Sequence, residues 1–310
     1  MNGILLVNKP PGPTSHDIVD IVRDKLGVKK VGHAGTLDPF AEGLLILGVG
    51  KATRILEYFQ HMDKVYWTTL KLGLITETFD ITGEVREENP CEISAEKVKG
   101  VLESFVGEYL QVPPAYSARK YKGRKLYELA RQGRIIRLPP RKVKIHWFEG
   151  VEYDEKEKRL RFTVKVSSGT YIRSLAMDVG YALGCGATVE ELVRIEQGPF
   201  KLSKAVNVME TDASEMVKVL LSMNEALAWM PALVVDEKQA RSVRNGGQVY
   251  APGVIDIVGN FEKDTIVRIL DSSGELLALA VSERTSKFIC TLKRLNRCDR
   301  VAKLKKVFAN

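Results

Sequence analysis

The chain has 310 residues, of which 45% are hydrophobic and 28% charged, and its 47 Lys and Arg against 39 Asp and Glu give a net charge of +8. This composition excludes a mainly disordered chain, and the length predicts about two domains. Four cysteines without a Cys-x-x-Cys pair, together with only four histidines, predict neither a disulfide scaffold nor a metal site. The longest near-apolar stretch, residues 43–50, is too short to cross a bilayer, so we expect a soluble protein of a reducing compartment.

The positive charge is concentrated in two blocks of the sequence. Residues 119–144 hold eleven basic side chains and one acid, and residues 284–310 hold nine basic side chains and one acid, so the rest of the chain is acidic. Basic runs are often only solvated surface, but two dense blocks on an acidic body favour binding of a polyanion. We interpret this partner as a nucleic acid, although composition alone leaves RNA, DNA and an anionic membrane open.

Local signals predict the N-terminal elements. Residues 4–7 are an apolar run typical of a short strand, and Thr14 and Asp17 have the spacing of a helix-capping box. Apolar residues at helical spacing then predict a helix that ends at Gly27. Residues 32–39 are small or polar and end in a proline, which predicts a loop.

The middle of the chain mixes strands and helices without a regular alternation. Residues 159–167 alternate apolar and polar side chains, as a half-buried strand does, and residues 65–75 favour another strand. We expect helices at residues 94–106, 171–184 and 188–195. The last prediction depends on Thr188 and Glu191, which have capping-box spacing. The mixture predicts an α+β fold on a mainly antiparallel sheet.

Beyond Pro231 the sequence consists of short β-rich runs. Residues 265–270 and 276–281 are separated by the turn sequence DSSG at 271–274, which predicts a hairpin. We therefore expect a small β-barrel-like domain at residues 231–310.

Asp38 is the sharpest candidate for chemistry. It lies between Leu37 and Pro39, which limit its access to water, and small residues precede it and let a ligand approach the backbone. A carboxylate in such a place can serve as nucleophile, base or metal ligand. The alternative is an aspartate that only caps a turn before the proline.

Two further segments combine aromatic and charged side chains. Thr170 lies at a strand-to-helix junction, where it is placed to cap the helix that follows. There Arg173 can pair with a buried carboxylate and Tyr171 can pack on a flat ring, or the two are only surface and core residues. Tyr66 and Trp67 must face opposite sides of a strand, so one belongs to the core and the other is free to stack on a base.

Taken together, these segments resemble the TruB family of tRNA pseudouridine synthases, in family order and over nearly the whole chain, and look most like a bacterial member. The matching segments are residues 8–15 (NKPxGxTS), 30–39 (KVGHAGTLDP), 64–66 (KVY), 76–83 (TETFDxxG), 112–118 (VPPAYSA) and 168–175 (SGTYIRSL). The C-terminal region is similar to the PUA RNA-binding domain that bacterial members carry.

The resemblance implies a pseudouridine synthase catalytic domain at residues 1–230, a PUA-like domain at residues 231–310, and an activity without cofactor or metal. Enzymes of this family convert the uridine at position 55 in the T loop of tRNA to pseudouridine. They flip the base out, break its N1–C1′ bond, rotate the base and rejoin it through C5. Attack at C1′, addition at C6 and elimination to a glycal are all compatible with the sequence.

The resemblance also implies roles for individual residues. Asp38 matches the catalytic aspartate, and Arg173 matches the arginine that pairs with it. Tyr66 matches the tyrosine that stacks on the target base and is placed to assist proton removal from C5, and Asp80 matches a second acid of the arginine–aspartate network. The expected substrate-binding residues are His33, which fills the space left by the flipped base, the wall residues Tyr171 and Leu192, Lys9 of the first motif, and Arg54 as a tRNA contact.

The two basic blocks then match an insertion at residues 119–144 that grips the T arm and a PUA-like surface that contacts the acceptor stem. We expect tRNA as the partner of a cytoplasmic monomer with no obligate protein partner and no membrane. One alternative is a guide-RNA-dependent rRNA pseudouridine synthase of the archaeal and eukaryotic branch, which needs protein partners; the long basic insertion favours the stand-alone tRNA enzyme. An RNA chaperone and a DNA-binding protein are the alternatives from other classes.

Overall fold

The computed structural model describes residues 1–116, 120–121, 123–125, 132, 136 and 138–308. Contacts within this part of the chain define two compact units, one of Met1 and Leu5–Leu220 and one of Asn2–Ile4 and Leu221 onward. Much of the basic segment 119–144 lies outside the described residues, so its expected grip on RNA stays a prediction.

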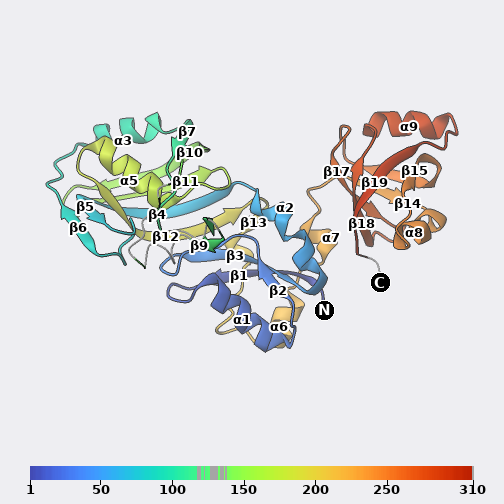
Figure 1. Ribbon diagram of the computed structural model, residues 1–310, viewed down its shortest axis with the longest axis horizontal. Helices are drawn as coiled ribbons and strands as arrows, with labels where there is room; N and C mark the ends of the chain where they lie inside the picture. Colours follow the sequence, from blue (N-terminus) through green and yellow to red (C-terminus); the bar gives the residue numbers. More distant parts are fainter. Residues whose placement is uncertain (117–119, 122, 126–131, 133–135, 137, 309–310) are drawn as a thin grey trace. The chain divides into compact units, whose positions relative to one another are not determined.

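The larger unit is built on a nine-stranded sheet of order β1-β3-β12-β4-β11-β10-β7, in which β2 also pairs with β3 and β13 with β12 (Figure 1). Its strands are β1 (Gly3–Lys9), β2 (Val31–His33), β3 (Glu42–Val49), β4 (Lys64–Leu72), β7 (Gly107–Gln111), β10 (Arg141–Asp154), β11 (Arg159–Val166), β12 (Ala187–Gln197) and β13 (Phe200–Lys201). Strands β3 and β12 are parallel, whereas β12–β4, β4–β11, β11–β10 and β10–β7 are antiparallel. The predicted mainly antiparallel sheet is confirmed.

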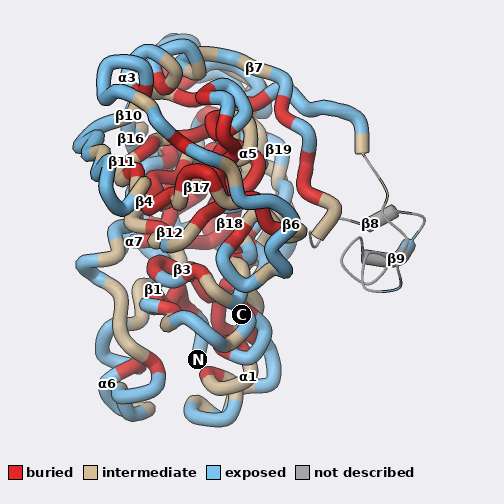
Figure 2. Tube along the Cα trace, turned by 90° about the vertical axis from the view of Figure 1, so that its left-hand side faces the viewer, coloured by how far each residue is buried: buried red, intermediate tan, exposed pale blue. Residues whose placement is uncertain are grey.

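Helices enclose two cores against this sheet. Helices α3 (Ala95–Ser104) and α5 (Ile172–Leu183) pack against the strands β4, β10, β11 and β12, whose buried side chains join theirs in one cluster. Helices α1 (Ser15–Leu26) and α6 (Ala213–Lys218) form a second cluster with β1 and β3. Burial is most complete along strands β1, β3 and β4 (Figure 2).

Shorter elements connect these layers. Strand β3 leads to β4 through η1 (Gly50–Ile55) and α2 (Leu56–Gln60). Strands β5 (Leu74–Thr76) and β6 (Val85–Glu88) form one small sheet, and β8 (Lys120–Tyr121) and β9 (Arg124–Lys125) form another. Turn η2 (Leu202–Lys204) follows β13.

Several local predictions are confirmed. The Thr14 hydroxyl accepts a hydrogen bond from the Asp17 amide, the Asp17 carboxylate accepts one from the Thr14 amide, and α1 ends at Gly27 with φ 62°. Helices α3 and α5 occupy the predicted ranges 94–106 and 171–184. Strand β11 buries alternate side chains, because one face packs on the α3–α5 layer.

The helix predicted at residues 188–195 is wrong, because these residues are the middle of β12. Thr188 caps nothing: its hydroxyl donates to the Leu74 carbonyl and accepts from the Thr76 amide. Strand β12 lies between β3 and β4, so neighbours on both sides satisfy its backbone. A capping box is a pattern of four residues, and pairing inside a sheet overrides such a local preference.

The smaller unit holds a six-stranded sheet of order β15-β19-β18-β17-β14-β16 (Figure 1). Its elements after the short helix α7 (Met223–Ala226) are β14 (Ala232–Val235), α8 (Glu237–Arg244), β15 (Val249–Tyr250), η3 (Ala251–Gly253), β16 (Val254–Val258), β17 (Ile266–Leu270), β18 (Leu276–Ser282), α9 (Ser286–Arg294) and β19 (Arg300–Val307). The predicted hairpin is β17–β18, and the Asp271 carboxylate accepts bonds from the Ser273 and Glu275 amides in its turn.

Two of the four cysteines, Cys91 and Cys185, form a disulfide, which the sequence did not predict. Cys91 precedes α3 and Cys185 follows α5, and both are buried in the core beneath these helices. Their sequence separation of 94 gives no local signal, so only the packing of α3 beside α5 brings the two side chains together. Cys290 and Cys298 are free and exposed.

Candidate active site

Asp38 is presented by the loop of residues 34–41, which joins β2 to β3. Leu37 and Ala41 of this loop are buried in the α3–α5 core, whereas the Asp38 side chain stays 34% exposed. Gly35 has φ 125°, a conformation that L residues with a Cβ rarely adopt, so this turn requires glycine. The loop therefore holds a carboxylate at the edge of an apolar core.

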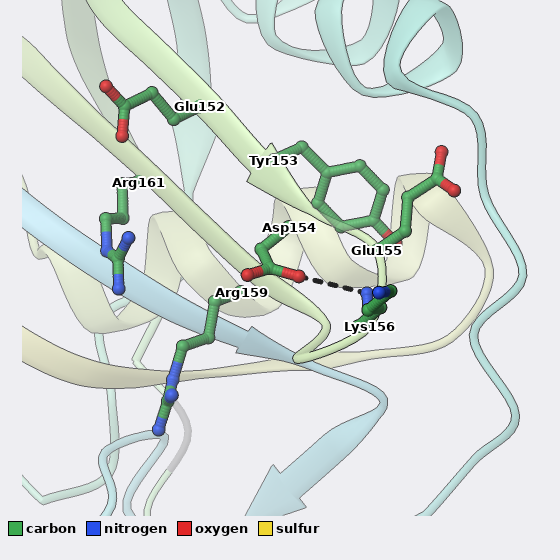
Figure 3. A pocket seen from close by; sticks show the side chains of 7 residues that line it. All are labelled: Glu152, Tyr153, Asp154, Glu155, Lys156, Arg159 and Arg161. Carbon is green, nitrogen blue, oxygen red and sulfur yellow. Dashed lines mark hydrogen bonds between the residues drawn. The ribbon is translucent and has the colours of Figure 1, made fainter.

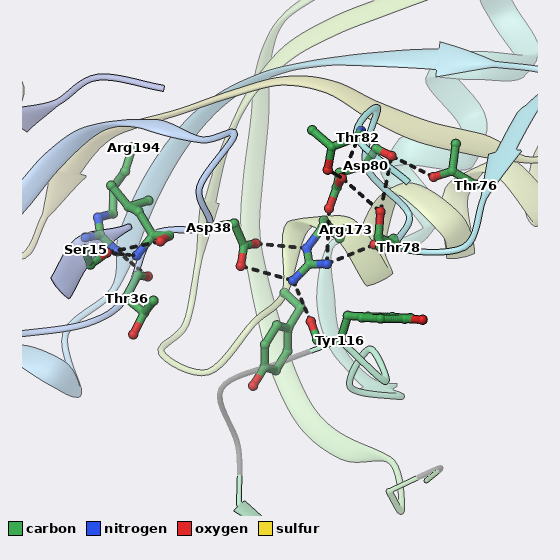
Figure 4. Close-up of polar contacts among 12 residues, drawn as sticks. Ser15, Thr36, Asp38, Thr76, Thr78, Asp80, Thr82, Tyr116, Arg173 and Arg194 are labelled. Carbon is green, nitrogen blue, oxygen red and sulfur yellow. Dashed lines mark hydrogen bonds and ion pairs between the residues drawn. The ribbon is translucent and has the colours of Figure 1, made fainter. Parts of the chain in front are cut away.

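Arg173 holds this carboxylate with two nitrogens (Figure 4). Its Nε lies 2.9 Å from Asp38 Oδ2, and its Nη2 donates to Oδ1 at 3.1 Å. Arg173 lies in the first turn of α5, and its side chain is only 6% exposed. A two-pronged guanidinium–carboxylate pair fixes orientation as well as charge, so Asp38 is held in one rotamer and keeps an accessible edge.

Asp80 completes an arginine–aspartate network behind Asp38 (Figure 4). Arg173 Nη1 donates to Asp80 Oδ2 at 3.2 Å and to the Thr78 carbonyl at 2.9 Å. The other Asp80 oxygen accepts from the Thr78 hydroxyl and from both the amide and the hydroxyl of Thr82. Asp80 is 4% exposed, so this fully bonded carboxylate anchors the arginine from the protein side.

Apolar and aromatic side chains adjoin the Asp38 loop. Tyr66 on β4 and Leu192 on β12 are buried in the same cluster as Leu37, each less than one tenth exposed. Trp67, on the other face of β4, is half-buried. The expected stacking residue, Tyr66, thus belongs to the core cluster that also holds Leu37 of the Asp38 loop, and its stacking role stays a prediction.

Tyr171 is the N-cap residue of α5, and Gln111 at the end of β7 binds its backbone. The Gln111 side chain accepts from the Tyr171 amide at 2.8 Å and donates to its carbonyl at 3.0 Å. The expected cap by Thr170 is wrong, because its hydroxyl donates back to the Ser167 carbonyl and α5 has no side-chain cap. Gln111 of the neighbouring strand thus holds the residue before α5, but it does not cap the first amides of the helix.

Lys9 and His33 bind at the two ends of the same loop. Lys9 is fully buried, and its ammonium donates to the carbonyls of Pro10, Pro39 and Ala41; burial lowers the pKa of Lys9 to about 8. His33 Nδ1 accepts from the Gly35 amide, and burial and then the charge of Arg194 lower the pKa of His33. The Lys9 ammonium is therefore occupied by hydrogen bonds to main-chain carbonyls, two of them in the Asp38 loop.

Arg54 is the remaining residue that the resemblance implied. It is exposed on η1, and no contact described here joins it to Asp38 or Arg173. The structure therefore brings Asp38, Arg173 and Asp80 into direct contact and leaves Arg54 at the surface, where a role in RNA binding stays a prediction.

Among the site-building residues that were missed from the sequence are Gln111, Arg194 and Ser15. Arg194 and Ser15 bind the backbone of the Asp38 loop by side-chain hydrogen bonds. Arg194 lies in the segment predicted as a helix, where an arginine is unremarkable. Once residues 187–197 are recognised as a central strand, a charged residue buried there is a strong signal of a specific role.

A hollow in the described residues lies apart from the Asp38 site. The tip of the β10–β11 hairpin forms a charged hollow (Figure 3), in which Asp154 accepts from the Lys156 amide and Arg159 pairs with Glu190 outside it. This tip is at the opposite end of β11 from the turn that leads to Arg173.

None of the described helices has the length and apolar character of a membrane span, and the described His, Cys, Asp and Glu form no group of three that could hold a metal.

Comparisons with known proteins identify the class of this fold and site. The sequence matches the family model of the TruB family pseudouridylate synthase N-terminal domain over residues 23–172, the tRNA pseudouridylate synthase B C-terminal domain over residues 173–228, and the PUA domain over residues 231–301. The protein is thus a pseudouridylate synthase with a C-terminal PUA domain.

Relatives and structures agree with this class. The chain is 51% identical to tRNA pseudouridine synthase B of Thermotoga maritima, over 99% of this chain and 98% of the relative, and 49% identical to that of Thermosipho melanesiensis, over 99% of each. The chain belongs to the TruB family, as the sequence motifs indicated. Among solved structures, it resembles an H/ACA RNP bound to a substrate RNA containing 2′-deoxyuridine, with a TM-score of 0.77 and 25% identity over 99% of this chain and 85% of the other. A Cbf5-Nop10-Gar1 complex gives a TM-score of 0.75 and 27% identity over 98% and 84%.

Proposed function

We propose that this protein isomerises a uridine in the T loop of tRNA, at position 55, to pseudouridine. The observation that carries the proposal is the Asp38 carboxylate, held in two-pronged contact by Arg173 while one third of its side chain stays exposed. The relatives that share half of their residues with this chain are named tRNA pseudouridine synthase B. The reaction breaks the N1–C1′ bond and forms a C5–C1′ bond; the proton at C5 is lost and N1 gains one, so no oxidant or co-reactant is needed.

The site residues divide this reaction between them. A stacked T-loop base must be flipped out, at a cost of a few kcal/mol, and stacking on Tyr66 offsets part of that cost. A carboxylate beside an anomeric carbon attacks or stabilises an oxocarbenium-like centre, as in glycoside hydrolysis. Attack at C1′, addition at C6 and elimination to a glycal all need Asp38 next to the flipped nucleotide.

Water must be kept away while the base is detached, because hydrolysis of the sugar would compete with re-attachment. Leu37, Tyr66 and Leu192 supply an apolar wall beside Asp38 for this purpose. In this proposal Tyr66 assists removal of the C5 proton, Tyr171 forms part of the wall around the target base, and His33 fills the space that the base leaves.

RNA binding is assigned to the two basic segments. Residues 119–144 would grip the T arm and the basic residues at 284–310, within the PUA domain and its C-terminal strand, would contact the acceptor stem. Both contacts are made to phosphates, so binding should weaken as salt is added. We propose that the protein acts on tRNA in the cytoplasm as a monomer without a partner chain.

The test is pseudouridine mapping in an unmodified tRNA transcript by carbodiimide modification. We expect wild-type protein to modify position 55, Asp38→Asn to abolish modification with tRNA affinity retained, and the control Asp24→Asn, on the exposed face of α1, to behave as wild type. Pseudouridine formed by Asp38→Asn would disprove the catalytic role of Asp38.

The guide-RNA-dependent alternative makes a different prediction in the same assay. The structures of H/ACA RNP and the Cbf5 complex share this fold at 25–27% identity, against 49–51% for the tRNA enzymes. Purified protein and tRNA alone should therefore suffice. A strict requirement for added proteins or guide RNA would favour the alternative, and displacement of tRNA by equal amounts of duplex DNA would favour a DNA-binding protein.

A further inference from the structure

The loop that carries Asp38 is held mainly by side chains from other elements. Gln197 donates to the Ala34 carbonyl at 2.8 Å, and Ser15 both donates to the Leu37 carbonyl and accepts from the Leu37 amide, at 3.1 and 2.9 Å. Between these two points, the carbonyls of residues 35 and 36 face the guanidinium of Arg194 (Figure 4).

Arg194 connects this part of the loop to the strand that follows it. Its Nη2 donates to the Gly35 carbonyl at 3.2 Å and its Nη1 to the Thr36 carbonyl at 3.5 Å, while its Nε donates to the Leu44 carbonyl on β3 at 2.7 Å. One planar group thus spans both ends of the β2–β3 connection. Only a guanidinium presents donors in a rigid fork of this width.

Fold stability does not explain why a cation occupies this place. Arg194 is 1% exposed, and within the described part of the chain no carboxylate forms an ion pair with it. Burial of a charge without a counterion is unfavourable, and the three carbonyls that Arg194 binds could be satisfied by uncharged donors. The pKa values of Lys9, His33 and Lys64 are lowered mainly by burial, and the positive charge of Arg194 lowers them further.

We propose that Arg194 is a positioning residue. It sets the position of Asp38 by fixing the Gly35 and Thr36 carbonyls against β3. This inference rests on the proposed catalytic role of Asp38. Arg173 fixes the orientation of the carboxylate from one side, and Arg194 fixes the backbone that carries it from the other. A displacement of about 1 Å in a reacting group can lower a rate about 100-fold, so the loop needs both.

The experiment measures single-turnover pseudouridine formation at saturating enzyme, where an unfolded fraction changes the apparent Kd but not the maximal rate constant. We expect Arg194→Met to lower that rate constant about 100-fold, with tRNA affinity changed less than about threefold. Arg194→Lys keeps the charge but loses the fork, so we expect a loss of about tenfold.

Arg268→Met is the matched control. Arg268 is also buried and donates to main-chain carbonyls, those of Met230 and Ala228, but it lies in the C-terminal unit. The maximal rate constant of the Arg268→Met variant should stay within about threefold of the wild-type value. Equal loss in both arginine variants would show a general effect of removing a buried cation and would overturn the proposal.

Ser15→Ala provides a second test if Arg194→Met does not fold. It loosens the same loop at Leu37 without removing a charge, and we expect the rate constant to fall about tenfold at unchanged affinity. A folded Arg194→Met or Ser15→Ala at the wild-type rate, beside an inactive Asp38→Asn, would overturn the positioning role alone. Activity in Asp38→Asn would instead overturn the proposed function.

Discussion

Asp178 on α5, the helix that presents Arg173, shows how packing affects a single carboxyl group. It is half-buried and has neither a hydrogen bond nor an ion pair to any described residue, and burial raises its pKa from 3.8 to about 6. The hydroxyl of Tyr109 accepts a hydrogen bond from Gln111. Burial raises the pKa of Tyr109, and the nearby charge of Asp178 raises it further. The helix that presents Arg173 therefore carries an acid that holds its proton more tightly than a free aspartate does.

This preference predicts how stability depends on pH. The folded protein binds the Asp178 proton more tightly than the unfolded chain does, so its contribution is favourable below pH 4 and is lost as pH rises through about 6. Asp178→Asn should therefore raise the free energy of unfolding at pH 7.5, by roughly 1–2 kcal/mol after allowance for solvent screening, and leave it nearly unchanged at pH 4. Urea unfolding at the two pH values measures this; the same change at both would contradict the burial argument.

Among the secondary-structure elements, β12 positions several side chains of the candidate site. Leu192 in the apolar wall, Arg194 against the Asp38 loop and Gln197 at the Ala34 carbonyl all lie on this strand. Its partners β3 and β4 bring the loop and Tyr66 to either side. A helix at residues 188–195 would have separated these side chains by helical spacing and removed the central strand of the sheet.

The junction between β7 and α5 depends on Gln111. This residue is 1% exposed, and its side chain makes two hydrogen bonds to the Tyr171 backbone, just before the turn that carries Arg173. Gln111→Met removes both of these hydrogen bonds, although the Tyr171 carbonyl keeps its bond from the Leu175 amide, so we expect the free energy of unfolding to fall by about 1–2 kcal/mol. Urea denaturation measures the change.

The neighbouring Leu110 supplies the control for this prediction. It lies on the same edge strand but is 67% exposed, so Leu110→Ala should change the free energy of unfolding by less than about 0.5 kcal/mol. Comparable losses in the two variants would mean that the edge strand as a whole, rather than the Gln111 amide, is sensitive.

At the scale of the whole molecule, the smaller unit begins before the PUA domain itself. Buried Arg268 on β17 donates to the Met230 and Ala228 carbonyls and to the Asn224 side chain, so the segment from Leu221 to Pro231 belongs to this unit. Leu227 and Met230 are buried in it. A chain cut at residue 230, the boundary that we proposed from the sequence, would expose both.

Removal of the smaller unit should therefore separate binding from chemistry. We expect a chain of residues 1–220 to bind tRNA at least about tenfold more weakly, because the phosphate contacts that we propose for residues 284–310 would be lost, while the maximal single-turnover rate changes less. A chain of residues 1–230 should aggregate more than 1–220 in sedimentation experiments. Unchanged affinity with lost chemistry in the shorter chain would contradict this division of labour.

Motifs and periodicities within a few residues were enough to predict the family, the α+β class, and the elements with strong local signals, such as α1 and the β17–β18 hairpin. The same motifs gave Asp38, Arg173 and Asp80 as candidate site residues. Folding of distant segments onto one another was needed to show that residues 187–197 are a strand, that Cys91 meets Cys185, and that Arg194 and Gln111 bind distant backbone. Each of these depends on partners at least 60 residues away in the chain, where local propensity carries no information and sheet pairing and burial decide the outcome.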